Sequence, residues 1–207
     1  MEFLVSMTTQ VPAGTSTAAV DDIRSREARR ARELAAEGTL LRLWRPPLKA
    51  GEWRTLGLFA ARDGQHLEQV LASMPLRVWR TDEVMPLDPH PNDPGRAWAS
   101  GADELAAAEF LTTFRVRIPE GTAAETVTST LASESTRARE LAEEGHLRRL
   151  WLQPAGAGPS TALGLWRARD ATDLRAILDS LPMDAWLDVE ITPLSEHPSD
   201  PQLAVVT

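Results

Sequence analysis

The chain contains no cysteine and no tyrosine, and it has no long hydrophobic run. Without cysteine there are no disulfides, no thiolate metal ligands and no cysteine nucleophile. No apolar stretch approaches the roughly 20 residues that a membrane span needs. An expected strand follows Met1 almost at once, which leaves no room for a signal peptide. We therefore expect a cytoplasmic protein with no membrane partner.

The chain also lacks an excess of basic residues. Its formal net charge is −8 and its pI is about 5.1, which argues against a nucleic-acid partner, because such proteins need a basic face. There is no glycine-rich phosphate motif, no nucleophile elbow and no histidine pair at metal-ligand spacing. These absences exclude most nucleotide, serine-hydrolase and zinc chemistry. We expect a small-molecule substrate and neither a metal nor a cofactor.

What the chain does contain is a duplication. A shift of 107 residues places Glu2-Phe3-Leu4 on Glu109-Phe110-Leu111 and the segment 30–35 on 137–142. The match runs without a gap to His90-Pro91-Asn92-Asp93-Pro94 over His197-Pro198-Ser199-Asp200-Pro201. A period of this size is the length of a small domain and too long for a solenoid repeat. The sequence predicts one domain at 1–94, a linker rich in Ala and Gly at 95–107, and a second domain at 108–207.

Each copy shows the same order of patterns. Apolar alternation predicts a strand at 3–11, and a long helix follows, with its cap near Thr15–Thr17 or Thr122 and its end at Gly38 or Gly145. Two strands, a helix that ends at a proline, and a last strand complete the unit. In the first copy these later elements lie at about 40–45, 55–60, 63–75 and 79–87. The order βαββαβ is that of a ferredoxin-like fold in the α+β class.

Two helices cover only one face of a four-stranded sheet, so the other face needs cover from elsewhere. The duplication supplies it if the bare faces of the two sheets meet. We therefore expect a pseudo-dimeric α+β barrel with a ligand cavity between the sheets.

One residue of the long helix interrupts its apolar stripe. Glu27 lies at helical spacing between Ile23 and Ala31, and Glu134 takes the same place in the second copy. A carboxylate on the sheet-facing side loses hydration, which raises its pKa towards the range of a general acid or base. The alternative is a glutamate at the edge of the stripe, exposed or paired with Arg42 or Arg149.

The second strand of each copy carries an arginine beside a tryptophan. Leu40, Arg42 and Trp44 are expected to share one face, as are Leu147, Arg149 and Trp151. Such a face suits a cavity in which the arginine binds a carboxylate and the indole forms a flat wall. The alternative is an ion pair of the arginine with a nearby Glu83 or Glu190. Two further tryptophans, Trp79 and Trp186, fit either the cavity wall or the core.

Two histidines and a group of charged residues are the remaining candidates. His90 and His197 stand in matching His-Pro segments and are either substrate-binding residues or solvated loop residues. The Arg/Glu pairs within 24–37 predict a salt-bridged solvent face.

These residues carry a resemblance to the muconolactone Δ-isomerase family. The matching pieces recur in the same order in both copies: the first strand into Val11-Pro12 or Ile118-Pro119, the helix glutamate, Glu-Gly before Leu-Trp, a Leu/Met-Pro pair, and His-Pro. The resemblance covers about 90 residues of each copy. It implies a ferredoxin-like α+β barrel and cofactor-free isomerisation of an unsaturated lactone that bears a carboxylate, with Glu27 and Glu134 as proton carriers. It also implies a homo-oligomer and C-terminal segments, here those of His90 and His197, that reach a neighbouring domain.

Some positions depart from the family pattern. The arginine after the tryptophan is Arg45 in the first copy but Leu152 in the second, and the loop between the second and third strands holds no histidine. These departures argue against muconolactone itself as substrate and leave open whether one site or two is active. The leading hypothesis is a proton-shuttling isomerase of a small lactone-like or oxygenated anionic substrate. The alternatives are a cyclase or isomerase of a secondary pathway with a larger apolar substrate, and a non-catalytic ligand-binding protein.

Overall fold

The structure is a computed structural model that describes residues 1–95, 108–154 and 161–202. Apart from Gly95, the expected linker at 95–107 therefore lies outside the described residues. The chain divides into two compact units. The first comprises Met1–Leu87 together with the segment that starts at Ser195, and the second comprises Asp88–Leu194.

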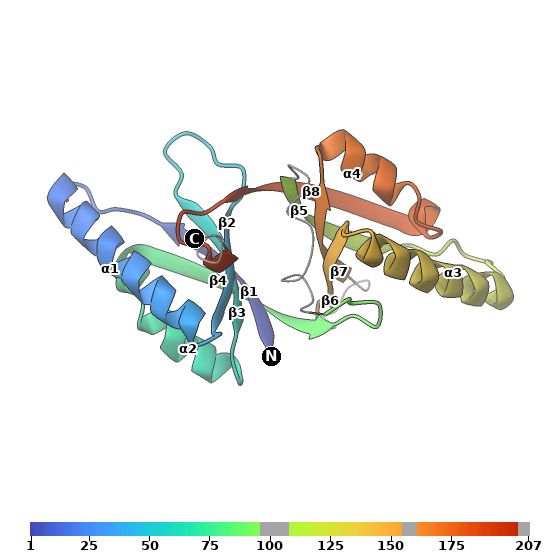
Figure 1. Cartoon of the computed structure of the whole chain (residues 1–207), viewed down its shortest axis with the longest axis horizontal. Helices are drawn as coiled ribbons and strands as arrows, with labels where there is room; N and C mark the ends of the chain where they lie inside the picture. Colours follow the sequence, from blue (N-terminus) through green and yellow to red (C-terminus); the bar gives the residue numbers. More distant parts are fainter. Residues whose placement is uncertain (96–107, 155–160, 203–207) are drawn as a thin grey trace. The chain divides into compact units, whose positions relative to one another are not determined.

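The first unit has the predicted order of elements (Figure 1). They are β1 (Glu2–Thr9), α1 (Thr17–Ala36), β2 (Leu40–Arg45), β3 (Arg54–Ala60), α2 (Gly64–Ala72), the short 3-10 helix η1 (Pro75–Trp79) and β4 (Arg80–Pro89). Antiparallel pairing gives the strand order β4-β1-β3-β2. Both helices lie on the same face of this sheet, where residues such as Val5, Leu34, Phe59 and Leu71 form the core.

The second unit repeats this arrangement. Its elements are β5 (Ala108–Val116), α3 (Ala124–Glu143), β6 (Leu147–Leu152), β7 (Thr161–Ala168), α4 (Ala171–Leu178), η3 (Asp184–Trp186) and β8 (Leu187–Glu196). The strand order is β8-β5-β7-β6. Helices α3 and α4 cover one face and bury Phe110, Leu141, Trp166 and Leu174 in the core (Figure 1).

The last strand of each repeat ends in the unit of the other repeat. At the end of β4, Asp88 and Pro89 pair with Leu152 and Trp151 of β6. At the end of β8, Ser195 and Glu196 pair with Arg45 and Trp44 of β2. The hydrogen-bonded strand order therefore closes as β1-β3-β2-β8-β5-β7-β6-β4. This is the fold class predicted: α+β, with two ferredoxin-like repeats in the strand order of a pseudo-dimeric barrel.

Local sequence signals explain where the helices begin and end. The Ser16 hydroxyl caps α1 by accepting a hydrogen bond from the Ala19 N–H, and the Asp63 carboxylate caps α2. Helix α3 begins without a side-chain cap at Ala123, so the capping expected near Thr122 is absent. Gly38 and Gly145 follow α1 and α3 with φ of 70° and 82°, the left-handed geometry that favours glycine.

The expectation that Leu40 shares a face with Arg42 and Trp44 is wrong. A register shift between Leu40 and Arg42 inserts one extra residue into β2, so Leu40 turns towards the helices and joins the core. The second repeat has the same irregularity between Leu147 and Arg149. The bulge makes both leucines part of the helix-side face and leaves the Arg and Trp on the opposite face.

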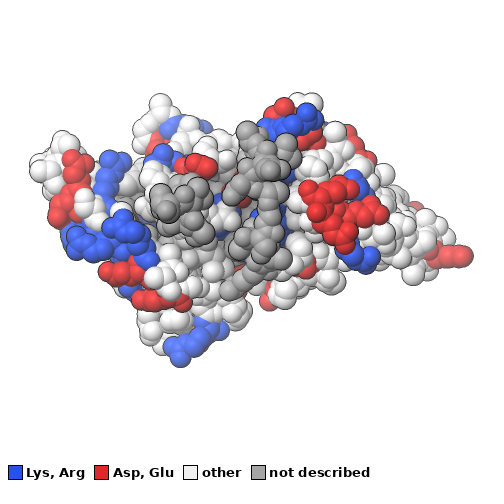
Figure 2. Space-filling view, in the orientation of Figure 1, with Lys and Arg blue, Asp and Glu red and all other residues white. Residues whose placement is uncertain are grey.

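The surface of α1 carries the predicted ion pairs. Arg26 pairs with Asp22, and Arg30 pairs with Glu33 and Glu37, all on the solvent side of the helix. Figure 2 shows basic and acidic side chains interspersed over this region. Of the helices in the described ranges, none combines the length and apolarity that crossing a membrane would require.

Candidate active site

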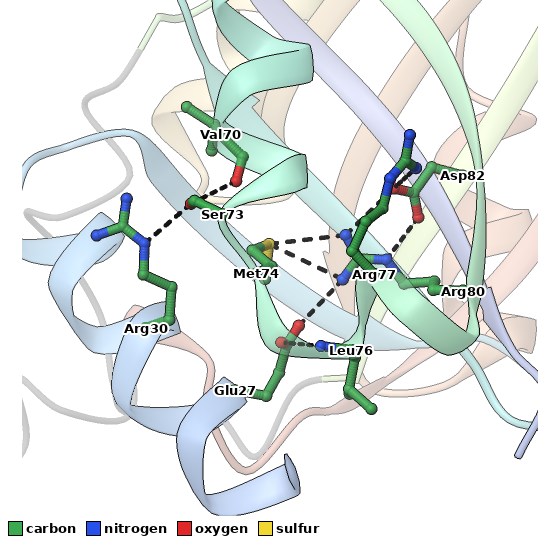
Figure 3. Close-up of polar contacts among 9 residues, drawn as sticks. All are labelled: Glu27, Arg30, Val70, Ser73, Met74, Leu76, Arg77, Arg80 and Asp82. Carbon is green, nitrogen blue, oxygen red and sulfur yellow. Dashed lines mark hydrogen bonds and ion pairs between the residues drawn. The ribbon is translucent and has the colours of Figure 1, made fainter.

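Glu27 is held between α1 and the turn that follows α2 (Figure 3). The backbone N–H of Leu76 donates to its Oε2 at 2.8 Å, and the Arg80 guanidinium donates to its Oε1 at 3.0 Å. Only 13% of the Glu27 side chain is exposed. The carboxylate thus faces the sheet side, as predicted, but its partner is Arg80 rather than Arg42.

Arg80 belongs to a buried network of charges. Its Nε and Nη2 donate to the two carboxylate oxygens of Asp82 at 2.6 and 3.1 Å, and its Nη atoms lie 3.8 Å from the sulfur of Met74. Arg77 also donates to Asp82, and its other terminal nitrogen reaches Glu68. The side chains of Arg80 and Asp82 are 2% and 1% exposed. Two arginines and two buried carboxylates therefore satisfy one another in the first unit.

The pKa of Glu27 is raised above its ordinary value, chiefly because burial disfavours the charged form. The hydrogen bond from Leu76 and the charge of Arg80 act in the opposite direction, while the nearby Asp82 adds to the rise.

Glu134 occupies the matching place on α3 in the second unit. The backbone N–H of Met183 donates to its Oε2 at 3.0 Å, as Leu76 does for Glu27. The positions that hold Arg80 and Asp82 in the first repeat are Leu187 and Val189 here. Within the described part of the chain, the Glu134 carboxylate has no ion-pair partner. Burial raises its pKa, and the Met183 hydrogen bond opposes this only in part.

Glu134 lines a cavity of about 390 Å³ inside the second unit. The cavity lies between α3 and the helix-side face of the sheet, with Phe114, Leu150 and Trp166 among its walls. Trp166 is fixed by a 2.8 Å hydrogen bond from its Nε1 to the Thr112 hydroxyl. Cavities of this size are typical of sites for small organic ligands.

The end of β4 and the tail after it bring a histidine to this cavity. His90, Pro91 and Asn92 line it, and the segment is anchored by the His90 N–H, which donates to the Leu150 carbonyl at 3.3 Å. The Nδ1 of His90 accepts a hydrogen bond of 3.0 Å from the Asn92 N–H, so the neutral ring carries its proton on Nε2. Burial lowers the pKa of His90, although the charge of Asp93 opposes the effect.

His197 holds the matching tail in the first unit. Its Nδ1 accepts from the Ser199 N–H at 3.1 Å. Burial and the charge of the exposed Arg45 lower the pKa of His197 to about 4. Both histidines are therefore partly buried, and neither is a solvated loop residue.

Arg42 and Arg149 form buried ion pairs with the tails. Arg42 donates through Nε and Nη2 to the Asp200 carboxylate at 3.0–3.2 Å, and the Leu43 N–H donates to the same group at 3.1 Å. Arg149 makes the equivalent contacts with Asp93 at 3.1–3.3 Å. The alternative pairing with Glu83 or Glu190 is wrong, because the aspartates of the tails take that role.

The tryptophans on these strands pack against the arginines. The Arg42 guanidinium lies 4.7 Å from the Trp44 ring centroid, and Arg149 lies 4.7 Å from that of Trp151. Both rings are 2% exposed. Arg149 and Trp151 are on the sheet face opposite the Glu134 cavity, so they do not line the cavity that contains Glu134. Trp79 and Trp186 are half-buried, and Trp186 is not among the residues that line the cavity.

Several site residues were missed at the sequence level. An aspartate stands at the same position of both tails, as Asp93 in the first copy and Asp200 in the second. This recurrence indicates a structural partner for the arginines. A second signal is that position 80 holds an arginine, whereas the corresponding position 187 holds a leucine. The difference indicates that the two glutamates have different surroundings. The role of Trp166, by contrast, depends on packing that no local pattern reveals.

The arrangement in the second unit can perform proton transfer. A carboxylate with a raised pKa lies in an apolar cavity, and a neutral histidine with Nε2–H lines the same cavity. Such a carboxylate can take a proton from carbon and return it. In the described ranges, no cluster of three or more His, Cys, Asp or Glu residues is placed to hold a metal ion.

Comparison with known proteins finds relatives of one family. A family model described as muconolactone delta-isomerase matches residues 1–93 and 108–200. The muconolactone Delta-isomerase of Cupriavidus pinatubonensis is 32% identical over 92 residues, which cover 44% of this chain and 97% of that protein. The enzyme of the same name from Acinetobacter baylyi is 28% identical over 92 residues, 44% of this chain and 93% of that protein.

Among solved structures, a heme-binding protein from Thermus thermophilus aligns with 100% of this chain and 96% of its own, with a TM-score of 0.57 and 13% identity. That likeness concerns the fold alone. The two family matches fall on the two repeats, one on each. The chain therefore belongs to the muconolactone delta-isomerase family and carries the family domain twice in tandem.

Proposed function

We propose that the protein is a cofactor-independent isomerase in which Glu134 moves a proton along an unsaturated, lactone-like carbonyl compound. The observation that carries this proposal is the position of Glu134, a carboxylate with a raised pKa in an apolar cavity, held by one backbone hydrogen bond from Met183. Membership of an isomerase family supports the same reaction class.

The reaction needs one group that acts first as base and then as acid. The Glu134 carboxylate takes a proton from the carbon next to the carbonyl, and the electron pair delocalises onto the carbonyl oxygen as a dienolate. The protonated Glu134 then returns the proton to the far carbon of the conjugated system. Substrate and product have the same atoms, and the enzyme ends unchanged. A pKa raised towards neutrality suits both steps.

His90 is the best-placed group to stabilise the developing negative charge. Its lowered pKa keeps the ring neutral near pH 7, and its Nε2–H is a hydrogen-bond donor because Nδ1 is occupied by the Asn92 N–H. A neutral donor close to the carbonyl oxygen lowers the energy of the dienolate without a bound cation. Ser135 lines the same cavity, but its hydroxyl already donates to the Leu131 carbonyl at 3.0 Å, which leaves His90 as the donor in this proposal.

We assign a structural role to Glu27. Its carboxylate is neutralised by Arg80, which fills the place that is open around Glu134. We also assign structural roles to Arg42 and Arg149, which bind the tail aspartates, and to Trp44 and Trp151, which pack on them. The two arginines are therefore not proposed to bind a substrate anion.

The test compares two matched variants on a simple lactone. The substrate is α-angelica lactone, a β,γ-unsaturated lactone whose conjugated isomer is detected by ultraviolet absorbance. We expect Glu134→Gln to lower kcat by about 100-fold or more. Glu27→Gln should leave kcat within about twofold of the wild type. Equal losses in the two variants, or full activity of Glu134→Gln, would refute the assignment.

A non-catalytic binding protein is the second candidate. In the first unit the ion pair with Arg80 already occupies the Glu27 carboxylate, so this fold can exist without an unpaired acid at that position. It predicts ligand binding without turnover in the wild type. A small-molecule ligand is common to both candidates. Four expectations stay predictions of the sequence. They are that the protein uses no cofactor, that it binds no nucleic acid, that it forms a homo-oligomer and that it is cytoplasmic.

A further inference from the structure

The cavity around Glu134 has no positively charged side chain in its described lining, although the family resemblance implies a substrate that bears a carboxylate. Its polar lining side chains are His90, Asn92, Glu134 and Ser135, and all the others are apolar. No lysine or arginine is among the described residues that line it. A substrate carboxylate would lose its hydration there without a counter-charge, and an ionised Glu134 would repel it.

Comparison of the two repeats shows where positive charge is missing. Arg80 of the first repeat corresponds to Leu187, and Arg24 corresponds to Leu131. Both leucines line the cavity. Arg149, the nearby buried arginine of this unit, is on the opposite sheet face and bound to Asp93. The second repeat therefore presents apolar side chains at both positions where the first presents a guanidinium.

The entrance to the cavity is also apolar. Ile118 and Leu131 both line it and are 43% and 45% exposed, which is high for large aliphatic side chains. Exposed apolar residues at the rim of a cavity are typical of a binding site for an apolar ligand. The corresponding Arg24 in the first unit instead stacks on Trp53, with its guanidinium 4.5 Å from the ring centroid.

The volume sets the size of the ligand. An apolar cavity of about 150 Å³ holds one benzene ring. The cavity of about 390 Å³ therefore has room for two or three rings. A single five-membered lactone with a short side chain would leave much of it unfilled, and the apolar walls would lose the contacts that stabilise a bound ligand.

We propose that the substrate of the Glu134 site is an uncharged, largely apolar carbonyl compound of two to three rings. The inference rests on the proposed function, because it names the substrate class of the same proton-transfer site. It differs from the carboxylate-bearing lactone that the family resemblance implies.

The test uses three lactones that share one β,γ-unsaturated five-membered ring and differ only in the substituent on its C5 carbon. The substituents are carboxymethyl, its methyl ester, and 2-naphthylmethyl. Binding is measured by titration calorimetry on Glu134→Gln, which keeps the cavity but removes the base. We expect the naphthylmethyl lactone to bind about tenfold or more tightly than the carboxymethyl lactone, with the ester between them. The order of kcat/KM in the wild type should be the same.

The outcomes separate the two proposals. Preference for the carboxymethyl lactone would overturn the substrate class, and the isomerase proposal would stand if that lactone were turned over. Tight binding of the naphthylmethyl lactone with no turnover of any lactone would overturn the isomerase proposal, and the site would then bind an apolar ligand without acting on it.

Two arginine variants test whether the ligand occupies this cavity. Leu187→Arg introduces the residue of the first repeat beside Glu134 and should abolish binding of the naphthylmethyl lactone. Val78→Arg adds the same charge at a site that is 75% exposed in the first unit, and binding should be unchanged. Equal binding by both variants would place the ligand elsewhere and overturn the proposal.

Discussion

Arg80 donates a hydrogen bond of 3.0 Å to the carboxylate of Glu27, and both side chains are largely buried. The same place in the second repeat holds Leu187, which lines an open cavity beside Glu134. The two repeats thus surround the same helix glutamate with an arginine in one case and a leucine in the other. Variants in one repeat can therefore be compared with matched variants in the other.

Replacing Arg80 with leucine should destabilise the protein strongly. Glu27 would keep its charge in a buried place without a cation, and Asp82 would keep only its contact with Arg77. The loss of one partner of a buried ion pair costs about 3–5 kcal/mol in the free energy of unfolding. The double variant Arg80→Leu/Asp82→Val, which copies Leu187 and Val189, should recover at least half of that loss. Chemical denaturation of the wild type, both single variants and the double variant measures the coupling. Additive effects would contradict a mutually dependent network.

The aspartates of the two tails provide a matched pair of variants. Asp93→Asn and Asp200→Asn each weaken buried hydrogen bonds to a charged arginine, and each should lower the free energy of unfolding by about 1.5–3 kcal/mol. Only Asp93 holds the segment that brings His90 to the Glu134 cavity. At a temperature where both variants are folded, kcat/KM should fall in Asp93→Asn and stay near the wild-type value in Asp200→Asn. A similar fall in both would show that activity follows stability alone.

The pH dependence of activity should report the environment of Glu134. If the ionised carboxylate is the base, kcat/KM rises with pH as Glu134 loses its proton. Burial raises the pKa of Glu134, so the midpoint should lie above the ordinary value of 4.5. Glu27→Gln should leave the midpoint in place. A midpoint at or below 4.5 would show that Glu134 is not the titrating base.

Stability should respond to pH through the same residue. A carboxyl group whose pKa is higher in the folded state than in the unfolded state stabilises the fold below the unfolded pKa. This contribution is lost as the pH rises through the folded pKa. Glu134→Gln stays neutral, so its free energy of unfolding relative to the wild type should be more favourable at pH 8 than at pH 4. Urea denaturation at the two pH values measures the difference. An unchanged difference would indicate that folding does not shift the pKa of Glu134.

The sequence was most informative where a local pattern has one structural meaning. Gly38 and Gly145 end the long helices as predicted. The duplication and the closed strand order followed from periodicity and from the need to cover an apolar sheet face. The glutamates were found because a charged residue interrupts an apolar helix stripe.

Other features depend on contacts between distant parts of the chain. The bulge next to Leu40 is invisible to a period-two pattern, since it adds one residue without changing composition. Asp200 meets Arg42 across 158 positions of the sequence, and no spacing rule connects them. Leu187 lines the cavity at Glu134, and a leucine in a strand normally predicts packing rather than a ligand site.

The tandem arrangement has a consequence for how such a site can evolve. In an assembly of identical single-domain subunits, any replacement appears in every copy, so a change that strengthens the scaffold also alters each reaction centre. Here the codon for residue 80 is separate from that for residue 187. One half can acquire a buried charge network that supports the molecule, while the other half keeps an unneutralised acid for chemistry. Selection on robustness and selection on turnover then act on different parts of one gene.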